Sequence, residues 1–254
     1  MIKFGVYYIP RPDAPLYRLG TAVVGYDIRA RRASDTADLP DALRRVGPLD
    51  ATWVAEAKPY GFHLTIGDAI DGDAGAISLV ERELDGLLRS FAPERPFTLH
   101  RRDDGVATWG HQREVVVVRY DPNEVLAMLH ALVIARLNPL GRGSGYLTRY
   151  LSGANAEMYA GQPARAAQVR TFYSPTVLDN WAPHFTLLNP YTGRDHDGMV
   201  RALGEAFDGF STVTVDTVCL CVQVDDATPW RIYQEFGRGT SARRIDEGEP
   251  DVRT

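Results

Sequence analysis

The order of apolar and polar residues predicts strands spread along the whole chain. Short β-branched and aromatic runs, or strict alternation of apolar and polar residues, are typical of strands. Such runs occupy residues 3–9, 62–66, 97–100, 115–120, 185–188 and 230–236, and a longer alternating run occupies 212–224.

Apolar residues recur at helical spacing in three other segments. In residues 76–91 they share one face of a helix. A second helix is expected to begin with Asp121 as its N-cap and Pro122 at its first position, and to end near Asn138. A third is expected at about residues 197–207.

The remaining stretches have no clear period. The segment that ends at about Pro59 reads as mixed helix and loop, and the segment before Pro183 is irregular. Residues 141–145 (Gly-Arg-Gly-Ser-Gly) lack the Gly-Lys-Ser/Thr ending of a P-loop, so a flexible linker is favoured over a phosphate cradle. The acidic end, residues 241–254, is expected to be a mobile tail.

Two similar tripeptides stand inside predicted strands, His63-Leu64-Thr65 and His184-Phe185-Thr186. Each is followed by a turn, a helix and further strands, which is a weak internal repeat. We therefore expect one α+β domain over residues 1–254, with two pseudo-symmetric antiparallel sheet lobes and flanking helices around a shared cleft.

The geometry of a strand indicates which side chains of these tripeptides can act together. Residues i and i+2 of a strand face the same side, so His63 and Thr65 project together, as do His184 and Thr186. An imidazole and a hydroxyl held this way can reach one phosphate. Alternatively, both histidines bond only to backbone groups and the threonines reflect β propensity, which explains each copy but not the pairing.

The paired motifs resemble the two-histidine phosphoesterase superfamily, which includes bacterial 2′-5′ RNA ligases and cyclic phosphodiesterases. Residues 15–22 and 25–27, followed by 60–63, resemble a less studied branch found with phosphonate-utilisation genes. In that branch a basic and aromatic stretch follows the first motif, whereas residues 67–69 here are Gly-Asp-Ala, which disfavours a phosphonate-related substrate.

The resemblance implies that His63 and His184 act as general acid and base and that Thr65 and Thr186 hold phosphate oxygens. Physical chemistry agrees, because opening a phosphodiester needs a base for the attacking hydroxyl and an acid for the leaving oxygen. Two imidazoles supply both near neutral pH, since the ordinary pKa of histidine is ~6.5. The sequence does not say which histidine is which, and no cofactor is required.

Other residues are weaker candidates for substrate binding. Tyr60 and Tyr191 flank the motifs and either stack on a base or serve packing. Arg142 and Arg149 add positive charge near the expected cleft.

Metal ligands are not apparent in the sequence. The four remaining histidines have no metal-ligand spacing and are expected to be structural or superficial: His100, His111, His130 and His196. The two cysteines, Cys219 and Cys221, share one face of a predicted strand and form no zinc motif.

Composition narrows the function further. With 44% hydrophobic residues the chain can bury a sizeable core. A net charge of −5 disfavours duplex DNA as a partner and suits a small nucleotide or a short oligonucleotide. No leading apolar signal and no long apolar run is seen, so we expect a cytoplasmic protein that does not bind membranes; a monomer is plausible.

The leading hypothesis is a metal-independent phosphodiesterase that hydrolyses cyclic or linear phosphodiesters. Three alternatives remain: RNA end joining by the same chemistry, a nucleotide-binding module without turnover, and a metal-dependent hydrolase. Retention of both histidines and both hydroxyls favours an enzyme over a decayed binding module.

Overall fold

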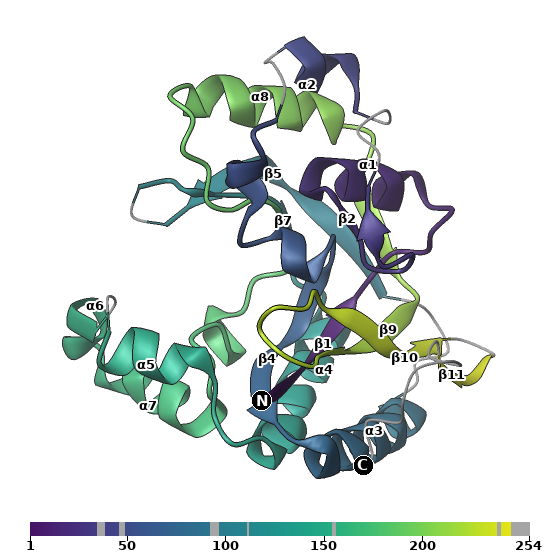
Figure 1. The fold of residues 1–254 in the computed structure, drawn as a ribbon, viewed down its shortest axis with the longest axis vertical. Helices are drawn as coiled ribbons and strands as arrows, with labels where there is room; N and C mark the ends of the chain where they lie inside the picture. The colour runs from purple at the N-terminus through teal and green to yellow at the C-terminus, as the bar shows by residue number, and fades with distance from the viewer. Residues whose placement is uncertain are drawn as a thin grey trace.

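A computed structural model describes residues 1–34, 39–45, 49–91, 97–110, 112–153, 156–237 and 240–244. Its main feature is a curled antiparallel sheet, which Figure 1 shows at the centre of the molecule. In the described residues the strand order is β11-β10-β9-β1-β4-β7-β6-β5-β8. The expected α+β class is confirmed, and the two lobes are the two halves of this sheet, which meet where β4 pairs with β7.

The strands of the main sheet are β1 (Ile2–Tyr8), β4 (Leu64–Gly72), β5 (Phe97–Trp109), β6 (Val115–Tyr120), β7 (His184–Leu188), β8 (Thr212–Val215), β9 (Thr217–Gln223), β10 (Arg231–Gly237) and β11 (Thr240–Arg244). A small separate sheet joins β2 (Tyr26–Asp27) to β3 (Arg32–Ala33). All seven segments predicted to be strands therefore contain strands. Strands β4 and β5 run well past their expected ends.

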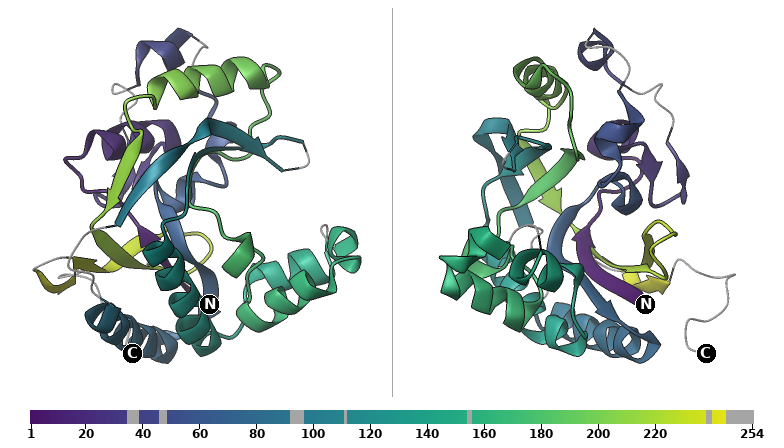
Figure 2. Two further views of the ribbon diagram at one scale, coloured as in Figure 1. Left: turned by 180° about the vertical axis from the view of Figure 1, so that it is seen from behind. Right: turned by 60° about the vertical axis from the view of Figure 1, so that its left-hand side comes forward.

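The α-helices are α1 (Pro15–Val24), α2 (Asp41–Arg45), α3 (Ala74–Phe91), α4 (Glu124–Leu137), α5 (Gly145–Leu151), α6 (Ala156–Ala160), α7 (Pro163–Phe172) and α8 (His196–Ala206). Short 3-10 turns are η2 (Ala51–Val54), η3 (Lys58–Tyr60), η4 (Asn138–Leu140) and η5 (Leu178–Asn180). Figure 2 shows α2 with α8 at one end of the molecule and α3 with α4 at the other.

The core lies beneath the central strands. Leu64 and Phe185 are both fully buried, and Phe185 stacks on Phe62 with ring centroids 4.5 Å apart. Helix α1 approaches this layer so closely that a Cβ at Gly20 would lie 2.3 Å from the ring of Phe62. Glycine at position 20 thus lets α1 cover the face of the sheet that the histidines do not use.

Helix α4 begins later than predicted. The N-cap of α4 is Asn123, whose side chain accepts from the N–H groups of Val125 and Leu126, and not Asp121. The backbone N–H of Asp121 still bonds to the carbonyl of His100, beside the strands. The side chain at position 123 is therefore the first one free to turn onto the new helix.

The run 212–224 is two strands at distant places in the sheet. It breaks at Asp216, which pairs with Arg11 at 2.7 Å, so that β8 joins β5 while β9 joins β1. Cys219 and Cys221 are buried free cysteines in β9.

Two segments expected to be mobile are built into the fold. Gly143 forms a β-bridge with Asp71, and the N–H of Arg142 bonds to the carbonyl of Asp71, so the flexible-linker prediction is wrong. Residues 241–244 belong to β11, which pairs with β10. The rest of the expected acidic tail lies outside the described residues, as does His111.

The irregular segment before Pro183 forms a helical arm, by which we mean α5, α6 and α7. In Figure 1 this arm projects from the body of the molecule. It has a small core of its own, in which Tyr159, Ala166 and Val169 are buried. The arm therefore keeps its shape by packing within itself.

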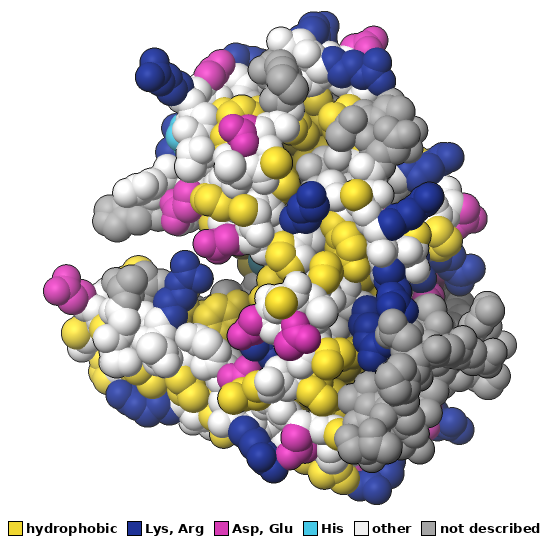
Figure 3. Space-filling view, in the orientation of Figure 1, with side chains coloured by type: hydrophobic (Ala, Val, Ile, Leu, Met, Phe, Trp, Pro, Cys, Tyr) yellow, Lys and Arg dark blue, Asp and Glu magenta, His cyan; other side chains and the backbone are white. Residues whose placement is uncertain are grey.

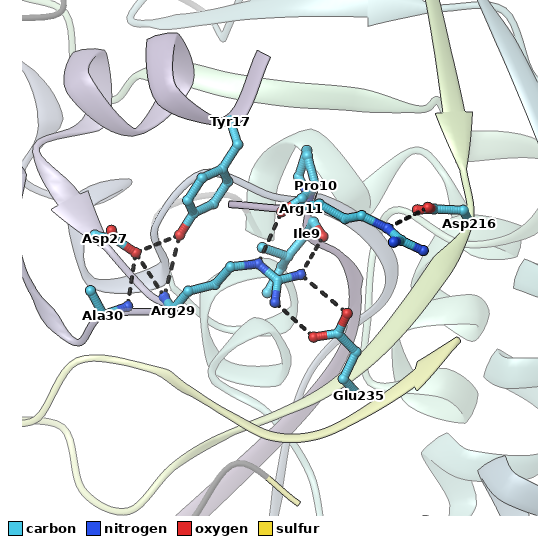
Figure 4. Close-up of polar contacts among 9 residues, drawn as sticks. All are labelled: Ile9, Pro10, Arg11, Tyr17, Asp27, Arg29, Ala30, Asp216 and Glu235. Atoms are coloured by element: carbon cyan, nitrogen blue, oxygen red, sulfur yellow. Dashed lines mark hydrogen bonds and ion pairs between the residues drawn. The ribbon is translucent and has the colours of Figure 1, made fainter. Parts of the chain in front are cut away.

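A buried polar network joins the segment before β3 to the main sheet (Figure 4). Arg29 donates to the carboxylate of Glu235 at 2.7 Å and to the backbone carbonyls of Ile9 and Pro10 at 2.9 and 3.0 Å. Asp27 accepts from the Tyr17 hydroxyl at 2.6 Å and from the Arg29 N–H at 3.0 Å. Each of the three nitrogens of the Arg29 guanidinium donates to at least one of these acceptors. This favours a single arrangement of the loop.

Replacing Arg29 tests this role. Arg29→Met should lower the free energy of unfolding by about 2–3 kcal/mol, because Glu235 and two carbonyls would stay half-buried without their donor. Arg11→Met is the matched control: the Arg11–Asp216 pair is the more exposed of the two, so its loss should cost under about 1 kcal/mol. Urea unfolding measures both, and equal losses would contradict the assignment.

Candidate active site

The two histidine motifs lie side by side on neighbouring antiparallel strands. Leu64 of β4 pairs with Phe185 of β7, and this register sets His63 opposite Thr186 and Thr65 opposite His184. The four side chains thus form a square in which each histidine is diagonal to the other. Diagonal partners across such a pair are about 7–8 Å apart, which leaves room for a phosphate between the rings.

Both imidazoles are held in the same way. Nδ1 of His63 bonds to the carbonyl of Gly61 at 2.9 Å, and Nδ1 of His184 bonds to the carbonyl of Ala182 at 2.8 Å. Because a carbonyl can only accept, Nδ1 carries the proton, and Nε2 of each neutral ring is left as an acceptor. Two equivalent Nε2 atoms suit an acid and base pair.

The electrostatics favour neutral rings in the free protein. Burial lowers the pKa of His63 to about 4, with a smaller contribution from His184 in the same direction. Burial likewise lowers the pKa of His184 to about 4, and the guanidinium of Arg119 adds to the shift. The Nδ1 hydrogen bonds to the backbone oppose both shifts.

Two aromatic rings pack against His63. His63 lies against Tyr7, with ring centroids 4.4 Å apart, and stacks on Tyr60 at 5.8 Å. Tyr60 in turn stacks on Trp230 at 5.1 Å. Of the two tyrosines expected to contact substrate, Tyr60 therefore lies at the site, where it supports one face of His63.

Tyr191 does not lie at the site. It is 4% exposed, packs edge-on against Trp53 and His196, and donates its hydroxyl to the carbonyl of Asp195. No ring face is left for stacking on a base, so the prediction of substrate binding by Tyr191 is wrong and its packing role is the one observed.

The positive charge beside the histidines comes from Arg119. This residue is opposite His184 in the β6–β7 register, so it projects from the same face of the sheet. Its guanidinium lies over Trp109 at 5.5 Å and bonds to Asp104 at 2.6 Å, and Trp109 meets the edge of His184 at 4.4 Å. Nε of Arg119 is buried without a partner among the described residues, and the guanidinium places a positive charge beside His184.

The two arginines singled out from the sequence are elsewhere. Arg142 is exposed and forms an ion pair with Asp73. Arg149 is exposed on α5. Its positive charge opposes the rise in the pKa of Tyr146. Arg119 could have been suspected from the sequence because it is the one charged residue in the apolar run Val115–Tyr120.

Trp181 and His130, which we call the clamp, both bond to backbone carbonyls of β4. The indole N–H of Trp181 donates to the carbonyl of Thr65 at 2.9 Å, and Nδ1 of His130 bonds to the carbonyl of Ile66 at 2.6 Å. The two rings stack 4.6 Å apart, and Nε2 of His130 accepts from the N–H of Leu178. His130 is therefore structural, as expected; burial lowers its pKa to about 4.

The clamp is needed because β4 and β7 pair only at Leu64 and Phe185. Beyond that point β4 continues without β7, and its carbonyls would lack donors in the buried layer. The side chains of Trp181, just after η5, and of His130 in α4 take the place of the missing strand and keep the Thr65 segment extended.

The histidines lie in a cleft. Its walls are the β5–β6 hairpin, which contributes Trp109, and the helical arm, which contributes Tyr146; Figure 3 shows the molecule hollowed between these two projections. Another depression, lined by Ser78, Glu81 and Gln234 among others, lies between α3 and β10, away from the histidines.

Neither a metal-binding cluster nor a membrane-spanning helix is found in the described residues. Within the described ranges, no group of three or more His, Cys, Asp or Glu side chains is arranged to hold a metal ion. In the same part of the chain, no helix is both long and apolar enough to cross a membrane. No protein-family model matches the sequence, and no curated protein matches it at a significant level.

Proposed function

We propose that this chain is a phosphodiesterase that needs no metal and cleaves a phosphodiester between His63 and His184. One observation supports this most strongly: two imidazoles on adjacent strands are fixed by equivalent Nδ1 bonds, each diagonal to the other and opposite a threonine. Backbone-bonded structural histidines would have no reason to share this arrangement.

The residues divide the chemistry between them. We assign His184, whose protonation is disfavoured by burial and by the Arg119 guanidinium, as the base that takes the proton of water through Nε2. His63, between the faces of Tyr7 and Tyr60, is better placed to be a cation, and it donates its Nε2 proton to the leaving oxygen. Thr65 and Thr186 donate to the equatorial oxygens, and Arg119 attracts the anion.

The experiment is an assay of nucleoside 2′,3′-cyclic phosphates, 3′,5′-cyclic nucleotides, cyclic dinucleotides and 2′-5′ oligonucleotides in excess chelator. Turnover that persists with chelator and is lost in His184→Ala would support the proposal. Turnover that appears only after a divalent metal is added would sink it. Binding without turnover would instead indicate the nucleotide-binding module.

The pH dependence is a second test, with a sign set by the lowered pKa values. One histidine must be protonated and the other neutral, and both have a pKa of about 4 in the free protein. The productive state is therefore lost as pH rises above the upper value of the pair and also as pH falls below the lower one. We expect kcat/KM to be bell-shaped, with its maximum below the ordinary histidine value of ~6.5.

Bound substrate changes this profile in a known direction. A phosphodiester anion beside the rings raises the pKa of both, so kcat should peak at a higher pH than kcat/KM. Complete profiles of both constants in chelating buffer provide the measurement. A single rise near pH ~7 that chelator abolishes is the behaviour of a metal-bound water and would contradict the mechanism.

A further inference from the structure

A carboxylate stands on the catalytic strand next to the histidine pair. Asp68 follows Thr65 on β4, where the pairing with β1 is irregular between Tyr7 and Phe4. Its Oδ2 accepts from the hydroxyls of Ser174 and Thr176. Burial raises the pKa of Asp68, and these two hydrogen bonds oppose the rise.

The other carboxylate oxygen of Asp68 is unused. Among the described residues Oδ1 accepts no hydrogen bond, and it is not one of the side-chain atoms sealed from solvent without a partner. An acceptor of this kind, fixed by two bonds to its sister oxygen and open to the cleft, is ready for a donor from a ligand.

Tyr146 lies in the first turn of α5, at the start of the helical arm. The nearby Asp68 carboxylate is the largest of the effects that raise the pKa of Tyr146 well above its ordinary value, yet the two groups form no hydrogen bond. The β-bridge between Asp71 and Gly143 fixes the start of the arm against β4 just beyond Asp68. The two groups are thus neighbours that are not bonded to each other.

We propose that Asp68 Oδ1 and the Tyr146 hydroxyl form a subsite beside His63 for a hydroxyl or amino group on the alcohol portion of the phosphodiester. This inference rests on the proposed function and adds a substrate class to it. Because Tyr60 stacks on His63 and also lies near Asp68, the subsite adjoins the histidine assigned to protonate the leaving oxygen.

The charges at the two ends of the cleft decide which substrates fit. Asp68 lies toward the His63 end and Arg119 toward the His184 end. A second phosphate on the alcohol would face the carboxylate and be repelled, whereas sugar hydroxyls or an ammonium would be held. The subsite therefore selects phosphodiesters with one phosphate and a neutral or cationic donor-bearing alcohol, such as cyclic mononucleotides, over oligonucleotides.

A matched pair of substrates isolates this selection: adenosine 2′,3′-cyclic phosphate, and the same compound carrying a 5′-phosphate. The wild-type protein should favour the first by at least about tenfold in kcat/KM. Asp68→Asn removes the charge at constant size and should reduce this preference about tenfold, mainly by improving the 5′-phosphorylated compound. Tyr146→Phe removes one hydroxyl and should lower kcat/KM for the first compound about tenfold.

Controls separate the subsite from the fold and from the chemistry. Asp85→Asn makes the same charge change on the surface of α3 and should leave the preference intact. Because Asp68 also anchors Ser174 and Thr176, Tyr146→Phe, which leaves these bonds in place, guards against a merely unfolded variant. Unchanged preference in both folded variants would overturn the subsite while leaving the phosphodiesterase standing. Absence of any turnover by the wild-type protein would overturn both.

Discussion

His63→Ala and His184→Ala should each lower kcat by about 10²–10⁴-fold, the usual cost of losing one general acid or base. The double variant should lose little more than either single variant, because the two imidazoles act on opposite sides of one phosphorus atom and neither is useful alone. Thr65→Ala and Thr186→Ala should cost less, since each removes one donor to the phosphate and leaves the proton transfers in place.

Steady-state rates with the best substrate of the panel provide this comparison. His100→Ala is the matched control, because this histidine is exposed on β5 and should be dispensable. Full turnover in both single variants would show that the diagonal pair is not the catalytic one. Additive losses in the double variant would show that the two rings work in separate steps.

Phe185→Ala should lower the free energy of unfolding by about 3–5 kcal/mol, the range for truncating a fully buried aromatic ring. The ring of Phe185 is 0% exposed and contacts the rings of Phe62, Tyr8 and Tyr120. A cavity there would also loosen the strand that carries His184 and Thr186.

The measurement is urea unfolding with Phe185→Leu alongside. Leucine fills much of the volume, so that variant should lose only about 1–2 kcal/mol. If alanine and leucine cost the same, the packing in this layer is not what stabilises the central strands. Activity lost in proportion to cavity size would link the core beneath the motifs to the geometry above it.

Strand alternation made each histidine and threonine pair predictable. The pattern His-x-Thr puts the chemistry on one face and Leu64 or Phe185 on the other, and the local sequence decides this without help from distant residues. The neighbouring pairing of β4 and β7 was not predictable, because it depends on which strands meet across long separations. Their register is what turns two separate motifs into one site.

Predictions failed where the deciding contact is tertiary. Alternation alone continued the strand through Asp216, but the ion pair with Arg11 marks the place where the chain leaves the edge strand β8 for β9, which lies between β10 and β1. Tyr191 follows a proline, as Tyr60 does, yet its ring is used in the packing of η2 and α8. The helical arm has short helices with a small core, so its sequence carries little helical period.

Some residues behind the family resemblance have a structural role. Tyr17 and Asp27 belong to the network around Arg29, and Gly20 allows α1 to approach Phe62. These positions support the sheet and do not contact the histidines in any bond described here. They therefore bear on the fold that the resemblance implies, whereas the proposed substrate selection rests on Asp68, Tyr146 and Arg119.

The strand order also means that the two halves of the molecule are interlocked. The stretch that begins with β4 and α3 continues into β5 and β6, which pair beside β7, whereas the stretch that begins with β7 and α8 continues into β9 and β10, which pair beside β1. Each half of the sheet therefore contains strands from both stretches of the chain. The same exchange of strands joins the two copies of a domain-swapped dimer, but here it occurs within one chain. Neither half is a continuous piece of chain, so neither can open by itself, and the seam that carries His63 and His184 persists as long as the whole fold does.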